Sequence, residues 1–364
     1  MLKANTVMLG VVLFLLFLFL INIPTEGKEF DLKASQDFYK EYYMSKDGRI
    51  MDPQKKHITT SEGQAYMLIR TLLMNDKETF DLVYRWSVNN LKRPDGLFSW
   101  LWGESQNGEY KILDANSASD ADIDIAFALL LAYEKWGEQK YLNEARVIIN
   151  SIWVNETKPI GGFLVLMPGV AQTLSGKNEI NPSYFSPYAF KLFAKYDPAH
   201  NWGALCESSY RILNIVMSDN KAGLPPDWFI LDNNNVVFEQ GRSDFSYDAI
   251  RVFPRVFLDY KMTGDRRASR ILDRVSFFID RWKLSHNFYT NYKLNGELKD
   301  NDKFIGSIAV LVPVINLYDE KVAAEIYNQE LYPHFKDRNY WTNKYDYYGQ
   351  NLLWFGCYLY QEIK

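Results

Sequence analysis

The sequence predicts an all-α protein built from helical hairpins. Apolar residues recur at helical spacing in segment after segment, and most of these segments are joined by short polar turns. Turns of this length are typical of antiparallel helix pairs. No Gly/Ser-rich or Pro-rich linker interrupts the chain from about residue 30 to residue 364, and 47% of the 364 residues are hydrophobic. We therefore expect a single domain over residues 28–364, with a substantial hydrophobic core.

The helical period is carried by eleven segments. In chain order these are 63–74, 79–91, 122–136, 142–154, 187–195, 204–217, 255–263, 268–282, 305–317, 321–330 and 351–361. Each boundary is expected to be accurate to about 2–4 residues. Eleven or twelve helices in hairpins can form an open stack or close into a ring, and the loop pattern favours the ring.

Four longer segments alternate with the short turns and are rich in aromatic and acidic residues. They cover residues 93–121, 155–186, 218–247 and 332–349. Alternation of long and short connections gathers the long loops at one end of the helices. Binding and catalytic residues are disproportionately found on such loops, so we expect the functional face there.

Composition excludes several function classes. Lys and Arg number 41 against 45 Asp and Glu, giving a net charge of −4, so no electrostatic attraction to DNA or RNA is expected. Two cysteines cannot build a disulfide framework or a cysteine-type zinc site. The four histidines are scattered without HExxH spacing. We expect no metal, no cofactor and no nucleic-acid partner.

The N-terminus carries an uncharged apolar run at residues 7–23, after Lys3. Its 17 residues are at the short end of a bilayer span and longer than most signal-peptide cores. Residues 1–27 are therefore expected to be either a cleaved signal peptide or an N-terminal membrane anchor. Both alternatives place the domain outside the cytoplasm, secreted or tethered to the cell membrane.

One acidic residue lies at the start of the helix predicted from about residue 63. Glu62 follows Ser61, which can cap the helix, and the helix dipole favours a carboxylate in the first turn. Capping alone can explain this arrangement. The functional alternative is a carboxyl group held on a rigid helix start and pointing into the loop-bearing face.

Three aspartates precede another long apolar helix. Asp120, Asp122 and Asp124 are more than capping requires, because they repel one another. Asp120 and Asp124 are four residues apart on one helix face, and Asp122 is turned away from both. A cation, a sugar hydroxyl or a proton shared with another acid could offset the repulsion. Dense acids of this kind are typical of sites with perturbed pKa values.

A third acid, Asp248, lies beside Tyr247 and three residues before Arg251. Pro254 either kinks a helix here or begins a new one, which would place Asp248 just before a helix near the mouth of the fold. The alternative is an ordinary surface Asp–Arg pair, which contributes little to stability.

Several aromatic residues fall in the long loops instead of on helical core stripes. They include Trp100, Trp102, Trp228 and Tyr348. A ring in a loop usually packs beneath that loop. Several rings beside carboxylates also suit stacking on sugar rings, and together they make a cleft for a long polymer plausible.

In this order, the motifs resemble those of glycoside hydrolase family 8, over nearly all of residues 35–364. The resemblance is carried by SEGQ at 61–64, LFSW at 97–100, ASDAD at 118–122 with the helix that runs to Trp136, and YDAIRV at 247–252. The resemblance implies an (α/α)6 barrel of six inner and six outer helices with a substrate cleft on the long-loop face. It also implies inverting hydrolysis of internal β-1,4 bonds in cellulose, mixed-linkage β-glucan, chitosan or xylan.

The resemblance also implies roles for single residues. Glu62 matches the proton donor, Asp248 the base that activates water, and Asp120 an acid beside the cleaved sugar. The expected substrate-binding residues are Tyr247, Arg251, Trp100, Trp102, Asp122, Trp228 and Tyr348. An inverting glycosidase needs one protonated and one ionised carboxyl, about 6.5–9.5 Å apart. A helix N-terminus favours ionised Glu62, whereas a charged Asp120 nearby would favour the protonated form.

The sequence departs from the family pattern in places that leave the substrate open. Ala65 and Tyr66 follow Glu62 where many members carry a small residue before Met, and the stretch 347–350 has no acid where some members carry one. With the apolar N-terminus, these features suit trimming of a bacterial exopolysaccharide as well as digestion of β-glucan. We expect a monomer. The alternatives are a catalytically silent glycan-binding barrel and, less favoured because histidines are few, a polysaccharide lyase.

Overall fold

The computed structural model describes residues 30–171, 176–336, 340–341, 343–344 and 346–362. The predicted signal or anchor at residues 1–27, including the run 7–23, lies outside the described residues. Within the described ranges, none of the helices combines the length and the hydropathy that crossing a membrane requires.

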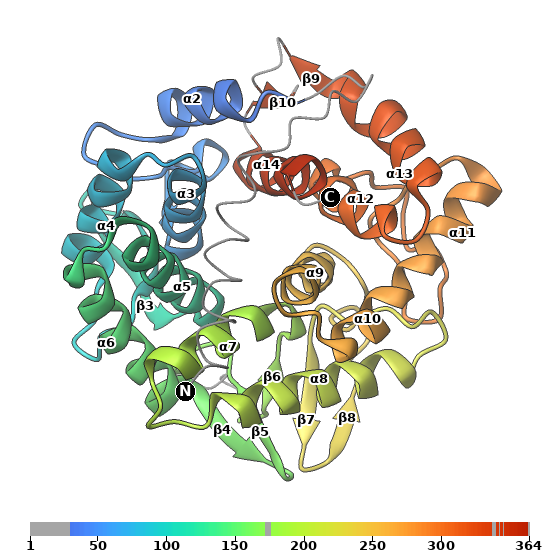
Figure 1. Cartoon of the computed structure of the whole chain (residues 1–364), viewed down its shortest axis with the longest axis horizontal. Coiled ribbons are helices and arrows are strands. Elements are labelled where there is room, and N and C mark those ends of the chain that lie inside the picture. The colour runs from blue at the N-terminus through green and yellow to red at the C-terminus, as the bar shows by residue number, and fades with distance from the viewer. Residues whose placement is uncertain (1–29, 172–175, 337–339, 342, 345, 363–364) are drawn as a thin grey trace, which may run out of the picture.

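Two concentric rings of helices make up the fold (Figure 1). The inner ring consists of α3 (Ser61–Leu73), α5 (Ser119–Trp136), α7 (Pro187–Tyr196), α9 (Val252–Thr263), α12 (Ile305–Asn316) and α14 (Tyr347–Glu362). The outer ring consists of α2 (Leu32–Tyr43), α4 (Lys77–Leu91), α6 (Gln139–Glu156), α8 (Trp202–Ser218), α10 (Arg266–Leu272) with α11 (Ser276–Ser285), and α13 (Glu320–Ile326). The predicted (α/α)6 barrel is confirmed.

The two rings differ in their hydrophobic patterns, as their positions require. The first fourteen residues of α5 are buried on every face, and so are the first eleven of α12. A helix that is apolar all round belongs inside a fold. By contrast, α4 buries a stripe that includes Phe80, Val83 and Trp86, and leaves its other side partly exposed.

All eleven predicted segments are helical. One of them is broken by a turn, and one further helix was not predicted. The segment 268–282 is broken by a 3-10 turn at Asp273–Val275, so it forms α10 and α11. Helix α2 was not predicted. Its buried stripe consists of Ser35, Gln36, Tyr39 and Tyr43. This polar and aromatic stripe lacks the aliphatic period on which the prediction depended.

The long loops contain short strands that the all-α prediction did not include. They are β1 (Thr59–Thr60), β2 (Ser99–Glu104), β3 (Tyr110–Ser117), β4 (Thr157–Ile160), β5 (Phe163–Leu166), β6 (Glu179–Ile180), β7 (Phe229–Asp232), β8 (Asn235–Val237), β9 (Phe335–Lys336) and β10 (Tyr340–Trp341). The antiparallel sheet β1–β2–β3 joins the residues before α3 to those before α5. It therefore fixes the starts of two inner helices relative to each other.

A buried arginine closes the ring between its first and last inner helices. Arg70 on α3 donates to Gln36 of α2 (2.7 Å) and to Asn351 of α14 (3.2 Å). Its guanidinium also lies over the rings of Tyr39 (4.0 Å) and Trp354 (4.8 Å). Burial lowers the pKa of Arg70 to about 9. The aromatic faces therefore stabilise a charge that has been removed from water.

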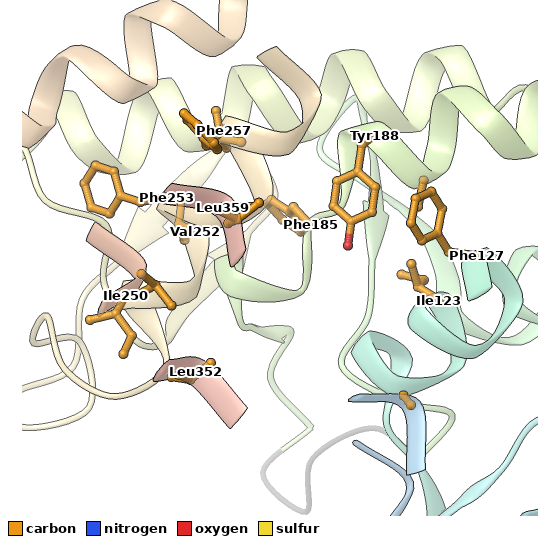
Figure 2. Close-up of a cluster of buried hydrophobic side chains, with 14 of the residues drawn as sticks. Ile123, Phe127, Phe185, Tyr188, Ile250, Val252, Phe253, Phe257, Leu352 and Leu359 are labelled. Carbon is orange, nitrogen blue, oxygen red and sulfur yellow. The ribbon is translucent and has the colours of Figure 1, made fainter. Parts of the chain in front are cut away.

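Apolar side chains from different inner helices meet along the barrel axis (Figure 2). Phe127 of α5 and Tyr188 of α7 make an edge-to-face contact with ring centroids 4.9 Å apart. A cavity of about 140 Å³ extends among these side chains, and Arg251 contributes to its lining. The polar site described below thus lies above an apolar interior.

Candidate active site

Glu62 occupies the first turn of α3, and another residue caps that helix. Thr60 is the N-cap, with its Oγ1 accepting the Gly63 N–H at 3.1 Å. The prediction that Ser61 caps the helix is wrong, because Ser61 Oγ is buried and makes no hydrogen bond within the described residues. The Glu62 carboxylate accepts a hydrogen bond from Arg251 Nη1 at 2.7 Å.

Asp120 lies in the first turn of α5 and is buried. Its Oδ2 accepts from Arg251 Nη1 at 3.1 Å, and its Oδ1 accepts the N–H of Ala121 at 2.9 Å. The side chain of Asp120 is 3% exposed, compared with 25% for Glu62. Asp120 is thus the innermost of the predicted catalytic acids.

Asp248 precedes the 3-10 turn Ala249–Arg251 that leads into α9. Its Oδ1 accepts from Arg251 Nη2 at 2.5 Å, and its Oδ2 accepts from Trp228 Nε1 at 2.9 Å. One guanidinium therefore binds all three predicted catalytic carboxylates, although they come from three separate parts of the chain. The structure brings Glu62, Asp120, Asp248 and Arg251 together as the sequence predicted.

Burial raises the pKa values of two of these acids, Glu62 and Asp120. Enclosure in the site raises the pKa of Glu62 to about 7; the Arg251 charge opposes this, and the charges of Asp120 and Asp248 add to it. Burial likewise raises the pKa of Asp120, again against the effect of Arg251. The contribution of Asp120 to Glu62 has the predicted direction, but burial is the larger cause. Glu62 can thus hold a proton near neutral pH.

The repulsion between Asp120 and Asp124 is offset by arginines. Asp124 accepts two hydrogen bonds from Arg255, both 2.8 Å long, and one from the Tyr188 hydroxyl at 3.1 Å. Arg255 on α9 lies four residues after Arg251 in the preceding 3-10 turn, and these two arginines meet two aspartates of α5. From the sequence, a cation, a sugar hydroxyl or a shared proton could offset this repulsion. On this face of α5 the cations are Arg251 and Arg255.

Asp122 does not lie in the cleft, so the prediction that it binds substrate is wrong. Its side chain is fully buried, and its Oδ1 accepts the N–H of Phe98 at 2.9 Å. It projects from the opposite face of α5, toward Glu156 at the end of α6. The helical period requires this, because a residue two positions after Asp120 points away from it.

Two tyrosines border the acids on the side of α14. The Tyr348 hydroxyl donates to the carbonyl of Tyr247 at 3.0 Å, and its ring stacks on Phe304 with centroids 5.6 Å apart. Tyr247 is 42% exposed and donates to Asp302 at 2.7 Å. Burial raises the pKa of Tyr348 well above its usual value, and the nearby Arg251 lowers it. The predicted cleft aromatic Tyr348 therefore lies beside the acids, whereas the side chain of Tyr247 is turned toward Asp302.

The three predicted tryptophans occupy different environments. Trp228 contacts Asp248 directly, and Trp100 is half-buried on β2. The ring of Trp102 packs against Trp86 (5.3 Å), Tyr110 (5.2 Å) and the guanidinium of Arg49 (4.2 Å). Since its ring is engaged in this cluster, the structure assigns Trp102 to packing of β2 against α4 instead of substrate binding.

In the described part of the chain, no three His, Cys, Asp or Glu side chains are grouped so that they could hold a metal ion. Arg251 supplies the positive charge at the site.

Comparison with known proteins identifies the family of this chain. The family model for glycosyl hydrolases family 8 matches residues 29–361. The chain belongs to glycoside hydrolase family 8. The endoglucanase of Escherichia coli K12 is 33% identical over 244 residues, covering 65% of this chain and 64% of the relative. Endoglucanase A of Acetivibrio thermocellus is 31% identical over 335 residues, covering 88% of this chain and 67% of the relative.

A solved structure of a similar protein supports the fold. The endo-1,4-D-glucanase of Vibrio fischeri ES114 is 29% identical, with a TM-score of 0.79, and the match covers 90% of this chain and 94% of that one. The matches to the curated Escherichia coli relatives span just under two thirds of those proteins' length.

The family-8 barrel also contains site residues that the sequence analysis did not identify. The Oδ1 atom of Asp227 accepts the N–H groups of Ser246 (3.1 Å), Asp248 (3.1 Å) and Ala249 (2.7 Å). Asp227 thus caps the turn that begins at Asp248. The Asp248 carboxylate does not cap this turn and accepts from Arg251. Burial raises the pKa of Asp227 to about 7, and Asp248 adds to this. The position of Asp227 next to Trp228 could have indicated a site residue. Its hydrogen bonds, however, reach N–H groups about twenty residues farther along the chain.

Tyrosines 66 and 184 were also missed. The Arg251 guanidinium lies 5.5 Å from the ring centre of Tyr184, which in turn lies 6.2 Å from the ring of Trp228. Tyr66 is buried one turn after Glu62 on α3, and the charges of Glu62 and Arg251 affect its pKa in opposite directions. Both rings help to exclude water from around Arg251.

Proposed function

We propose that this chain is an inverting endo-β-1,4-glycanase that acts outside the cytoplasm. The observation that carries the proposal is the cluster in which Arg251 binds Glu62, Asp120 and Asp248 at the starts of different helical elements. An inverting glycosidase requires one carboxylic acid and one carboxylate on opposite sides of the bond that is cleaved.

Glu62 is proposed as the general acid. Its pKa, raised to about 7, keeps it protonated in mildly acidic and neutral solution, so that it can donate to the leaving glycosidic oxygen. Asp248 is proposed as the base that takes a proton from the attacking water. It accepts from Arg251 and Trp228, which fix its orientation. Glu62 accepts from Nη1 of Arg251, and Asp248 accepts from Nη2.

Asp120 is proposed to act beside both groups without exchanging a proton with the leaving group. It is buried next to Arg251, where its carboxylate can accept from a sugar hydroxyl and its charge favours the protonated form of Glu62. Tyr247, Tyr348 and Trp228 are the aromatic side chains placed to contact sugar rings, and Trp100 is a candidate farther along β2.

The substrate proposed is a β-glucan or a bacterial exopolysaccharide. Similar proteins are named endoglucanase or endo-1,4-D-glucanase. The apolar run at 7–23 supports secretion or a membrane tether, with the catalytic domain outside the cell. A monomer is proposed, because the three acids and their arginine all come from one chain.

The test is the release of new reducing ends from carboxymethylcellulose, barley β-glucan, chitosan, xylan and the host's own exopolysaccharide. Glu62→Gln should lower the rate by about 100-fold to 10,000-fold, because it removes the general acid. Glu104→Gln replaces an exposed glutamate at the end of β2 and should retain the full rate. Glycan binding without reducing ends on every substrate would instead favour a catalytically silent glycan-binding barrel.

A further inference from the structure

A second pair of acids lies on the other face of α5, directly behind Asp120. Asp122, in the first turn of α5, and Glu156, the last residue of α6, are both fully buried. Asp122 Oδ1 accepts the Phe98 N–H at 2.9 Å, and Glu156 Oε1 accepts the Ser117 hydroxyl at 2.6 Å. Each carboxyl group thus has one oxygen with a donor.

The other two oxygens are buried and have no donor. Among the described residues, no N–H or O–H reaches Oδ2 of Asp122 or Oε2 of Glu156. Yet the two carboxyl groups are within hydrogen-bonding range of each other. Two carboxylates can form such a bond only if one of them carries a proton.

Among the described residues, the cation whose charge reaches this pair is Arg93, and it is bound to another acid. Arg93, on the turn before β2, binds Asp95 with its Nη2 at 2.8 Å and also through Nε. Asp120 is the other charged group facing the pair, and its cation is Arg251. Two ionised carboxylates facing each other in this interior would be strongly unfavourable, which is the situation in which carboxyl groups share a proton.

We propose that Asp122 and Glu156 share one proton between Oδ2 and Oε2, and that this hydrogen bond positions Asp120 for catalysis. The positioning role rests on the proposed function, whereas the shared proton does not. Neither residue touches the substrate.

The hydrogen bonds around the pair explain how it can position Asp120. They connect the first turn of α5, the end of α6, the start of β2 at Phe98 and the end of β3 at Ser117. The Ser117 hydroxyl also accepts the N–H of Val170 at 3.0 Å. Asp120 lies between Ser117 and Asp122 in the chain, so the backbone that carries it is held on both sides.

The proton also gives the pair a pH signature. In the unfolded chain both acids ionise at about pH 4. In the folded protein burial raises the pKa of Glu156 to about 8 and that of Asp122 well above its usual value. The folded protein therefore holds a proton that the unfolded chain has lost. Linkage then requires stability to fall as pH rises from about 5 to about 8.

The decisive experiment is thermal unfolding of the full-length protein from pH 5.5 to pH 8.5 in four forms: wild type, Asp122→Asn, Glu156→Gln and the double variant. Either single amide can donate to the remaining carboxylate without a shared proton, so each should reduce the loss of Tm between pH 5.5 and pH 8.5. The part of the loss that comes from Glu62 and Asp227, whose pKa values are also raised, should remain. The double variant turns two NH2 groups toward each other and should have a lower Tm than either single variant at pH 6. Glu41→Gln, an exposed control on α2, should behave as wild type.

Two outcomes would overturn the shared proton. One is an unchanged pH slope in Asp122→Asn. The other is a double variant as stable as the singles, since two repelling carboxylates would both be relieved by amides.

The positioning role is tested by kinetics below the Tm of each variant. Asp122→Ala should lower kcat about tenfold with little change in KM, and Asp122→Asn should recover most of that loss. Equal kcat in Asp122→Ala and wild type would show that the pair does not position Asp120. An inactive wild type would refute the proposed function, while the unfolding series would still decide the shared proton.

Discussion

Helices α5 and α9 face each other through two sets of acids and arginines, one helical turn apart. In the lower set, Asp124 and Arg255 pair one to one, with two hydrogen bonds of 2.8 Å. In the upper set, Arg251 serves Glu62, Asp120 and Asp248 together. The residue types are the same, but the ratio of charges differs.

This difference separates a structural ion pair from a reactive site. Complete pairing in the lower set compensates each buried charge, as a stable interior requires. In the upper set burial raises the pKa of Glu62 to about 7, and one cation shared among three acids does not reverse this effect. An incompletely compensated cluster at the open end of the barrel can therefore retain a transferable proton.

Replacing the upper arginine should have the largest effect. In Arg251→Met the three carboxylates lose their shared donor, and the rate of reducing-end release should fall by about 1,000-fold. Buried Asp120 also loses its cation in this variant, so some stability should be lost as well, and the rate is therefore compared below the Tm of the variant. Near-normal activity would contradict the assignment of Arg251 to the site.

Replacing the lower arginine should affect stability instead. Arg255→Met leaves Asp124 buried without its cation and should lower the free energy of unfolding by about 3–5 kcal/mol, measured by urea denaturation. Asp124→Leu in the same background should restore part of the loss. If Arg255→Met lowered kcat strongly without changing stability, the contrast between the two sets would be wrong.

The pH–rate profile should sharpen the role of Asp120. In the proposed mechanism Glu62 donates a proton, so the wild-type rate should decline as pH rises above about 7. In Asp120→Asn a negative neighbour is lost and Arg251 acts on Glu62 more strongly, which lowers the pKa of Glu62. The basic limb should move down by about one pH unit. A basic limb at the same pH as in the wild type would exclude this role of Asp120. Glu104→Gln is the control, and its pH–rate profile should match that of the wild type.

The smallest effects should distinguish two tryptophans. Trp228→Phe removes the indole N–H that Asp248 accepts and should lower kcat by about fivefold to tenfold. Trp102→Phe keeps a ring in the packing cluster, so kcat and KM should stay at the wild-type level while stability falls by about 1 kcal/mol. A large rise in KM for Trp102→Phe would return this residue to the cleft.

The inner helices and the central acids could be predicted because their signals are local. Apolar periodicity located α3, α5, α9 and the other inner helices, and the density of aspartates before α5 indicated uncompensated charge. Asp122 was misassigned because proximity in sequence to Asp120 was given more weight than the helical period that separates the two side chains.

The residues that were missed depend on contacts between distant segments. Asp227 binds N–H groups about twenty residues away across a loop, and Tyr184 lies beneath Arg251 after a connection of irregular structure. Trp102 had the composition of a cleft aromatic, and only the position of Arg49 and Trp86 reveals its packing role. No local pattern encodes such contacts.

The closure of the ring by Arg70 has a consequence for how the chain matures. Asn351, which binds Arg70, follows it by 281 residues, so the contact that completes the barrel forms only after α14 has been synthesised. Contacts of such long sequence separation slow folding, and the incomplete chain exposes apolar helices in the meantime. A ribosome-bound nascent chain that ends before α14 should therefore depend on chaperones until α14 is available to close the ring.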